Sequence, residues 1–314
     1  CASVFSISIE IAEGWNWLSV NLESDGNDID NVLSSLNSEI NDQIKNQTAS
    51  AIYYGVEGGW QGTLQNIDVT SMYMLSSANS GSLDFTGMPA NPSSNPISLE
   101  AGWNWIGYLP QDEYEINYAL ETVSAVLNDQ IKNQTSSAIY YGEVGGWLGT
   151  LSAMGSGQGY MLSVSNSSIL VYPSSGDNVL SRTNNKMELP LSISSWEVNS
   201  HAFEFNGTID MSIDSRKDSD GDYIGVFVDD ECRGFGKRIY FPINGSFYYS
   251  AMVYSNVFEG EKLTFKYYDS MNDKIINYDE NIEFTANMIV GNGLNTFGLS
   301  LEVLEIPDNY LLNK

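Results

Sequence analysis

The feature that most constrains this chain is a segment of fifteen residues that occurs twice. Residues 41–55 read NDQIKNQTASAIYYG and residues 128–142 read NDQIKNQTSSAIYYG, so the copies differ only at Ala49 and Ser136. A near-identical stretch repeated along one chain indicates a supersecondary unit copied in tandem. We therefore expect two copies of one small module, in a protein that binds or assembles rather than catalyses.

The repeat extends well beyond this segment. A Gly-Trp-Asn-Trp motif at residues 14–17 returns at residues 102–105, and a Tyr-Met-Leu motif follows later in each copy. These matches keep nearly the same spacing, so one small insertion or deletion separates the copies. The two units therefore run over residues 4–96 and 97–172.

The apolar pattern predicts the elements of each unit. Apolar and polar residues alternate ahead of the Gly-Trp-Asn-Trp motif, which predicts a strand. The next apolar residues have helical spacing, and Asp28 stands before those of the first unit as an N-cap. Short β-rich runs between Gly-Gly, Asn and Ser clusters follow. Each unit is predicted to be a small α+β module of about four or five strands and one helix.

The second half of the chain has a different texture. Residues 173–186, PSSGDNVLSRTNNK, are polar and rich in Ser and Asn, which is typical of a linker. Over residues 187–305, short aromatic and β-branched runs alternate with turns, which predicts a β-sandwich. Residues 306–314 are taken as a C-terminal spacer. The predicted fold class is mainly β with some α (α+β): two tandem small α+β repeat domains followed by a β-sandwich domain.

The charge balance limits the partners. The chain has 13 Lys and Arg residues against 40 Asp and Glu residues, a formal net charge of −27. A protein that binds polyanions needs a basic face, so we expect neither nucleic acid nor an anionic membrane surface as partner. The acidity favours divalent cations and an external setting, although a solvated acidic surface explains it equally well. No apolar run approaches the roughly 18 residues of a transmembrane segment.

The two cysteines, Cys1 and Cys232, leave several alternatives open. Cysteines outside the cytosol often pair, and this pair could close within one chain or join neighbouring chains. Because the sequence begins with Cys1 rather than Met, it is interpreted as a processed or trimmed chain, and Cys1 could instead carry a lipid. Two unpaired thiols are the remaining reading.

Several motifs resemble those of a known group of secreted proteins. The stretch Gly-Trp-Asn-Trp-Ile-Gly-Tyr at residues 102–108 resembles a repeat of secreted proteins from the Bacteroidota and related phyla, in which a Gly-Trp turn and a Gly-Tyr-Met strand follow, here residues 146–147 and 159–161. Residues 224–228 and the Glu-Cys-Arg-Gly motif at residues 231–234 resemble a module of the same proteins. Together these resemblances cover nearly the whole chain.

The C-terminal residues carry a separate resemblance. Residues 306–313, IPDNYLLN, are similar to the spacer that precedes a type IX secretion sorting domain. The resemblance implies export through the outer membrane, removal of the sorting tail and a location outside the cell or at its surface. It implies location rather than activity, because the family has no agreed activity for these modules.

Nothing in the sequence predicts an enzyme. The one histidine, His201, lies beside an alternating run and is most simply a strand residue. Nucleophile-elbow, Walker and dinucleotide-binding motifs are missing. We therefore expect no catalytic residues.

A cluster of aspartates is the metal candidate. The stretch Asp-Ser-Arg-Lys-Asp-Ser-Asp-Gly-Asp holds Asp214, Asp218, Asp220 and Asp222. Alternating carboxylates around a Gly turn can converge on Ca²⁺, the possible cofactor, although the full EF-hand pattern is not met. The alternative is a solvated acidic hairpin loop.

Tryptophan supplies the ligand candidates. Trp15 and Trp17 are two residues apart and share one face of a strand, which favours packing in the core of the unit. Trp60 and Trp147 each follow a Gly-Gly turn, so they are the predicted exposed residues that stack on a sugar ring.

The duplicated segment is a predicted contact surface. Its polar part contains Lys45 and Lys132, and two equal patches on one chain would give avidity toward a repeating partner. A recent duplication that has not drifted explains the identity equally well. We expect a secreted, non-enzymatic structural or adhesive protein that associates with copies of itself into an extracellular filament or layer. The alternative is a monomeric protein that binds extracellular polysaccharide or another surface.

Overall fold

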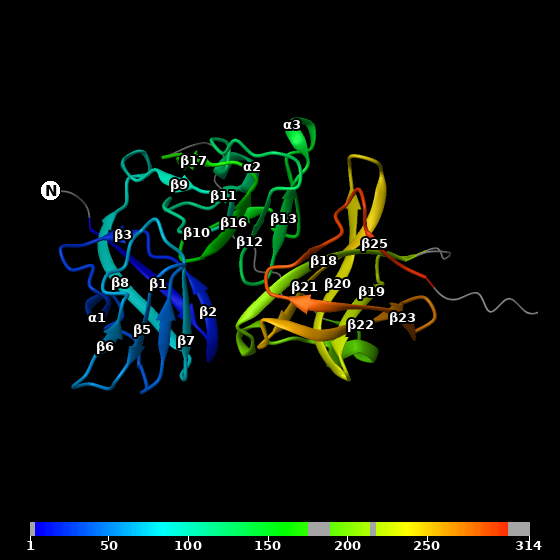
Figure 1. The fold of residues 1–314 in the computed structure, drawn as a ribbon, viewed down its shortest axis with the longest axis horizontal. Helices are drawn as coiled ribbons and strands as arrows, with labels where there is room; N and C mark the ends of the chain where they lie inside the picture. Colours follow the sequence, from blue (N-terminus) through cyan, green and yellow to red (C-terminus); the bar gives the residue numbers. More distant parts are fainter. Residues whose placement is uncertain (1–3, 175–188, 214–217, 301–314) are drawn as a thin grey trace, which may run out of the picture. The chain divides into compact units, whose positions relative to one another are not determined.

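The computed structural model describes residues 4–174, 189–213 and 218–300, which are mainly β with short helices (Figure 1). The mainly-β class with some α is thereby confirmed. The chain divides into two compact units. Unit 1 comprises residues 1–188 together with Asn199–Asn206, and unit 2 comprises Leu189–Val198 together with Gly207–Lys314. Both sequence repeats therefore lie in one unit.

The two repeats have the same central sheet. In the first repeat its order is β2-β7-β4-β5-β6, and in the second it is β10-β16-β12-β13-β14. The elements of the first repeat are β1 (Phe5–Ile11), β2 (Gly14–Leu18), β3 (Leu22–Glu23), α1 (Ile29–Val32), β4 (Gln43–Lys45), β5 (Ser50–Tyr53), β6 (Trp60–Gly62), β7 (Tyr73–Ser77), β8 (Gly81–Pro89) and the 3-10 turn η1 (Pro92–Ser94). Those of the second are β9 (Ile97–Leu99), β10 (Gly102–Ile106), β11 (Tyr114–Glu115), α2 (Ile116–Ala119), β12 (Gln130–Lys132), β13 (Ser137–Tyr140), α3 (Gly142–Gly145), β14 (Trp147–Gly149), β15 (Ala153–Met154), β16 (Tyr160–Val164) and β17 (Ser168–Leu170).

The predicted helix is present in both repeats but is a single turn long. Asp28 caps α1 as expected, because its side chain accepts a hydrogen bond from the backbone N–H of Asn31 at 3.0 Å. The buried residues of α1 are Ile29 and Val32, and they join the apolar core of the first repeat.

The Gly-Trp-Asn-Trp motif is a turn followed by an edge strand. Gly14 has φ +95° and Gly102 has φ +98°, the left-handed region that favours glycine. The Asn16 side chain accepts from the N–H of Ala12 at 2.9 Å and donates to its C=O at 2.8 Å, which closes the turn. Asn104 makes the same pair of bonds in the second repeat. The tryptophans then alternate with Asn16 and point to the opposite face of the sheet.

The described residues of unit 2 form one hydrogen-bonded sheet of eight strands in the order β23-β22-β19-β20-β21-β18-β24, with β25 also paired to β18. Its strands are β18 (Phe205–Ile213), which begins in unit 1, β19 (Tyr223–Val228), β20 (Glu231–Phe241), β21 (Ser246–Ser255), β22 (Glu259–Asp269), β23 (Lys274–Thr285), β24 (Ile289–Val290) and β25 (Phe297–Leu299).

The sheet of unit 2 folds over on itself. The rings of Phe265 on β22 and Phe297 on β25 lie 5.3 Å apart, although these strands are far apart in the sheet order. Ser300 donates from its backbone N–H to the Glu280 carboxylate on β23 at 2.8 Å. Apolar side chains of the two ends therefore face each other and fill the interior.

The first residues of unit 2 cover the outside of this sheet. The 3-10 segment η2 (Leu191–Trp196) buries Ile193 and Trp196 against Phe227 on β19 and Cys232 on β20. The rings of Trp196 and Phe227 lie 5.5 Å apart in an edge-to-face arrangement. Both faces of β19 are thus covered by apolar side chains.

Candidate functional site

The duplicated segment joins the two repeats to each other. Its Gln134 accepts from the Trp17 N–H at 3.1 Å and donates to the Trp15 C=O at 2.8 Å, along the outer edge of β2. Gln47 makes the equivalent bonds to Trp105 N–H and Trp103 C=O, both at 2.9 Å, along the edge of β10. Each side-chain amide thus replaces a neighbouring strand, and the repeats are related by an approximate two-fold arrangement.

The tryptophans of the motif pack between the repeats rather than in the core of each. Trp15, Trp17 and Met74 lie on the face of the first sheet opposite its own core, and they form one cluster with residues of the second repeat, namely Met161, Trp103 and Trp105. The prediction of core packing within each unit is wrong in this respect. Alternation shows that two residues share a face, but it does not say which face meets the core.

The predicted sugar-stacking residues are buried. Trp60 and Trp147 are each 4% exposed and belong to the cores of the first and second repeat. The Trp60 ring lies 5.4 Å from that of Tyr53, and the Trp147 ring lies 5.3 Å from that of Tyr140. Exposure of these two residues is therefore a wrong prediction, because each begins an edge strand of the sheet, β6 or β14, and its ring lies on the core face of that sheet.

The lysines of the duplicated segment also point inward. Lys132 is 1% exposed, with its Nζ 2.7 Å from the Asn206 side-chain oxygen and 4.9 Å from the Trp103 ring centre. Burial lowers the pKa of Lys132 to about 7. Lys45 lies 4.8 Å from the Trp15 ring centre and pairs with Glu204. The prediction that these lysines form two outward patches is wrong.

The partner of both lysines is a short segment of unit 1, Asn199–Asn206, which includes the 3-10 turn η3 (Ser200–Ala202). His201 Nδ1 lies 2.6 Å from the Trp15 C=O. The histidine therefore has a structural contact with β2 rather than the strand position that its sequence suggested.

Three aspartates of the cluster, Asp218, Asp220 and Asp222, each have at least one side-chain oxygen bound to a protein group. Asp218 and Asp220 both pair with Arg238. Asp222 accepts from the Ser219 N–H, the Ser270 N–H and the Tyr267 hydroxyl. No group of three or more metal-ligating side chains occurs among the described residues, and Asp214 lies outside them. The Ca²⁺ site, which includes Asp214, therefore stays a prediction from sequence.

The thiol of Cys232 is free and buried, and it donates to the Gly234 C=O at 3.3 Å. Burial raises the pKa of Cys232 to about 11. Cys1 lies outside the described residues, so its predicted pairing stays a prediction.

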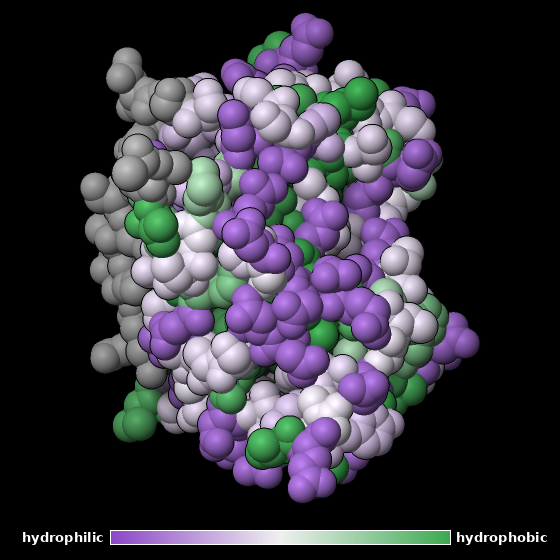
Figure 2. Space-filling view, turned by 90° about the vertical axis from the view of Figure 1, so that its left-hand side faces the viewer, coloured by the Kyte–Doolittle hydropathy of each residue, from purple (hydrophilic) through white to green (hydrophobic). Residues whose placement is uncertain are grey.

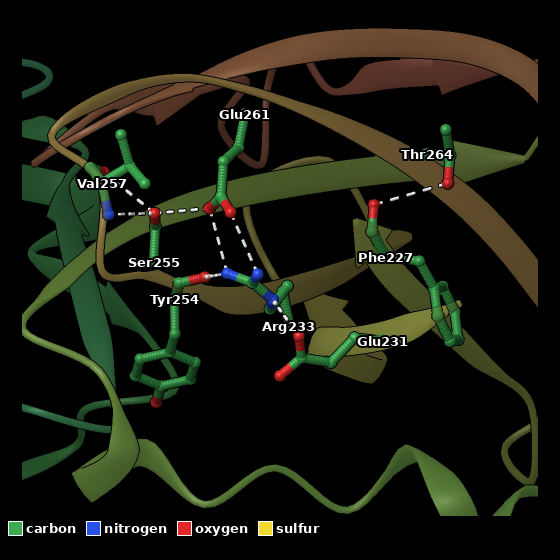
Figure 3. A network of polar contacts seen from close by, with 8 residues as sticks. All are labelled: Phe227, Glu231, Arg233, Tyr254, Ser255, Val257, Glu261 and Thr264. Carbon is green, nitrogen blue, oxygen red and sulfur yellow. Dashed lines mark hydrogen bonds and ion pairs between the residues drawn. The ribbon is translucent and has the colours of Figure 1, made fainter. Parts of the chain in front are cut away.

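The Glu-Cys-Arg-Gly motif builds an ion-pair network in unit 2 (Figure 3). Arg233 binds Glu261 in bidentate fashion, with both N–O distances 3.0 Å, and also donates to the Tyr254 C=O. Glu231 lies 3.3 Å from its Nε, and Ser255 donates to Glu261. The charges of this motif therefore join strands β20, β21 and β22.

Exposed apolar side chains occur on corresponding loops of the two repeats, although not at identical positions. In the first repeat, Val56 lies in the β5–β6 turn and is 96% exposed, and Ile40 before β4 is also exposed. In the second, Val144 lies in the corresponding β13–β14 connection and is fully exposed, and Leu127 before β12 is also exposed. We call these two groups the apolar tips. In Figure 2, by contrast, hydrophilic residues cover the middle of the face in view and hydrophobic residues occur in small separate groups.

Comparison with family models, curated proteins and solved structures found no match. In the part of the chain that the structure describes, no helix is long and apolar enough to cross a membrane. The sequence places Gln47 and Gln134 in the polar part of the duplicated segment, the predicted contact surface, and both make contacts between the repeats of one chain. Sequence reasoning missed the segment Asn199–Asn206, for which no local pattern gave a signal.

Proposed function

We propose that this chain is a secreted, non-enzymatic structural or adhesive protein that associates with copies of itself outside the cell. The observation that carries the proposal is the pair of apolar tips at equivalent ends of the two repeats. Contact sites are marked by grouped exposed apolar side chains, and such a group occurs once in each repeat. Two similar contacts on one compact unit give the bivalence that a filament or layer requires.

The direction of the tips supports a double-ended connector. Strand β5 has the β4–β5 turn at one end and the β5–β6 turn at the other. The β4–β5 turn holds Gln47 against the second repeat, so the β5–β6 turn, with Val56, points away from that repeat. The second repeat has the same arrangement, with Val144 in α3 at its outer end. Figure 1 accordingly shows β6 and α3 near opposite ends of unit 1.

The chemistry of the described residues supports a role without catalysis. Lys132 is buried against tryptophan rings, His201 contacts a backbone carbonyl and Asp222 accepts hydrogen bonds from three groups. In this proposal unit 2 is a β-sandwich-like module that accompanies the repeat pair. The acidic composition and the resemblance to secreted proteins favour the extracellular location.

The test is the assembly state of the full chain, measured by light scattering and negative-stain imaging. We expect concentration-dependent assembly that the V56D/V144D double variant abolishes, because a charge on each tip opposes burial. The matched S94D/S152D variant adds the same charges at exposed serines and should still assemble. A wild-type chain that stays monomeric at all concentrations would refute the proposal. Retention of such a monomer on a polysaccharide gel would favour the carbohydrate-binding alternative, whose two predicted stacking residues are buried.

A further inference from the structure

The segment Asn199–Asn206 has an unusual place in the chain. By its contacts it belongs to unit 1, whereas Leu189–Val198 before it and Gly207 onward after it belong to unit 2. A segment of this kind is held by one body and connected to another at both of its ends. The segment and the surface that holds it can therefore belong to different molecules.

The surface that holds the segment is specific. Glu204 pairs with Lys45, and Asn206 accepts from the Lys132 ammonium at 2.7 Å. The Asn206 amide donates to the Gln134 C=O at 3.2 Å. Both lysines of the duplicated segment are thus committed to one short peptide, which explains why a charged side chain such as Lys132 is stable where it is buried.

The shape of the surface also fits the segment closely. A Cβ built on Gly14 would lie 2.1 Å from the His201 carbonyl oxygen. The equivalent glycine of the second repeat, Gly102, has no atom within 4 Å of the same position. The two repeats have equivalent edge strands, β2 and β10, and the segment therefore lies beside Gly14 of β2 and not beside Gly102 of β10.

Both ends of the segment are firmly anchored in unit 2. Trp196, three residues before it, is 3% exposed against Phe227, and β18 continues from it into the eight-stranded sheet. The remaining connection between the two units in the sequence is the stretch after Ser174. Residues 175–188 are 14 residues, which span at most about 50 Å when extended. That reach allows the segment and the surface to come from different molecules.

We infer that, in the assembled protein, Asn199–Asn206 of one copy binds the repeat pair of a second copy. The same contacts form in either case, so exchange between copies costs little beyond chain entropy. In dilute solution the linker keeps the intramolecular contact at an effective concentration in the millimolar range. Contact between apolar tips raises the local concentration of copies. This inference therefore rests on the proposed self-association, in which the exchanged segment is a second contact between copies.

Exchange of this kind gives an open polymer. Each copy offers one segment and one surface at different places, which is a head-to-tail contact. Such contacts continue from copy to copy unless the rotation closes a ring. The partner that fits the surface is therefore a second copy of this chain, recognised through Lys45, Lys132 and Gln134.

The ion pair between Lys45 and Glu204 provides the test. Equal amounts of ¹⁴N-labelled and ¹⁵N-labelled full chain are mixed in denaturant, refolded together and allowed to assemble. A carbodiimide then joins the Lys45 amine to the Glu204 carboxyl as an amide, with loss of one water. Mass spectrometry of the digest distinguishes a linked pair of peptides of one isotope from a hybrid pair. The E204Q variant, which lacks the carboxyl, identifies the linked peptide by its loss.

We expect hybrid pairs in assembled material, in the proportion that random mixing gives, and same-isotope pairs alone at high dilution. Assembled material with same-isotope pairs only would overturn the exchange and leave the proposed self-association standing. Absence of assembly by light scattering in the same sample would overturn both. The two failures are thus distinguished in one experiment.

Discussion

Gln47 and Gln134 each bind the edge strand of the other's repeat, with four hydrogen bonds between 2.8 and 3.1 Å. An edge strand presents unpaired N–H and C=O groups that would otherwise pair with another chain. The duplicated segment therefore serves the pairing of the repeats within one molecule. The glutamine of each copy makes the same contact with the other repeat.

The Q134A variant should be less stable than wild type by about 1–3 kcal/mol, because the partly buried Trp17 N–H loses its partner and the Trp15 C=O keeps only its contact with His201. The Q47A variant should lose less than about 1 kcal/mol, because water can replace its amide at an exposed site. Urea unfolding followed by tryptophan fluorescence measures both. Equal losses would contradict the difference in burial between the two contacts.

Substitution of two glycines isolates the docking of the segment Asn199–Asn206. G14A and G102A pay the same backbone cost of about 1–2 kcal/mol, because both residues have φ near +95°. Only G14A also clashes with the His201 carbonyl. We expect G14A to increase hydrogen exchange in residues 199–206 and G102A to leave it unchanged. Equal hydrogen exchange of residues 199–206 in both variants would show that Gly14 does not control the contact.

Stability of unit 1 should depend on the charge of Lys132. Its folded pKa, about 7, lies below its ordinary value of 10.5, so between these values the unfolded state binds one more proton than the folded state. Stability should therefore rise as pH increases from about 7 toward 10, by at most about 1.4 kcal/mol per pH unit. As pH falls toward 7, unit 1 loses this added stability. Urea midpoints across this range measure it.

The control for this prediction is K132M, which removes the titrating group and keeps an unbranched apolar chain. The rise with pH should be absent in K132M. Above pH 10 the comparison ends, because burial raises the pKa of Tyr73 to about 12 and the unfolded state then loses phenolic protons first. An unchanged slope in K132M would assign the effect to other groups.

Loss of Arg233 should destabilise unit 2 strongly. R233M leaves the partly buried Glu261 without its bidentate partner, which costs about 3–5 kcal/mol. The R233M/E261L double variant removes both charges and should recover most of that loss. Hydrogen exchange in β20 and β22 measures the effect. A double variant as unstable as R233M would show that packing by the arginine stem, rather than the unpaired charge, dominates.

Several predictions from sequence are confirmed because they depend on local chemistry. Asp28 caps a helix because its side chain reaches the N–H of a residue three positions on. The Gly-Trp-Asn-Trp motif forms a strand in both repeats. The helix that follows is shorter than its apolar spacing suggested, since tertiary packing rather than periodicity limits its length.

The candidate contacts were predicted less well. Trp60 and Trp147 follow Gly-Gly turns, and a turn gives no information on whether the next side chain lies outside or under the sheet. Lys45 and Lys132 look like surface residues by type, yet both bind a segment far along the chain. Such contacts depend on pairing over large sequence separations, which no local pattern contains.

The sequence by itself determined that the chain holds two copies of one segment and that its residues are mainly in strands. These properties follow from periodicity, turn residues and duplication, all of which act over a few neighbouring residues. Only the tertiary structure decided that the two modules bind each other, that their shared face is made of tryptophan and methionine, and that Asn199–Asn206 binds the lysines beside it. The physical reason is that alternation along a strand defines two faces, whereas long-range packing decides which of them is buried and against what.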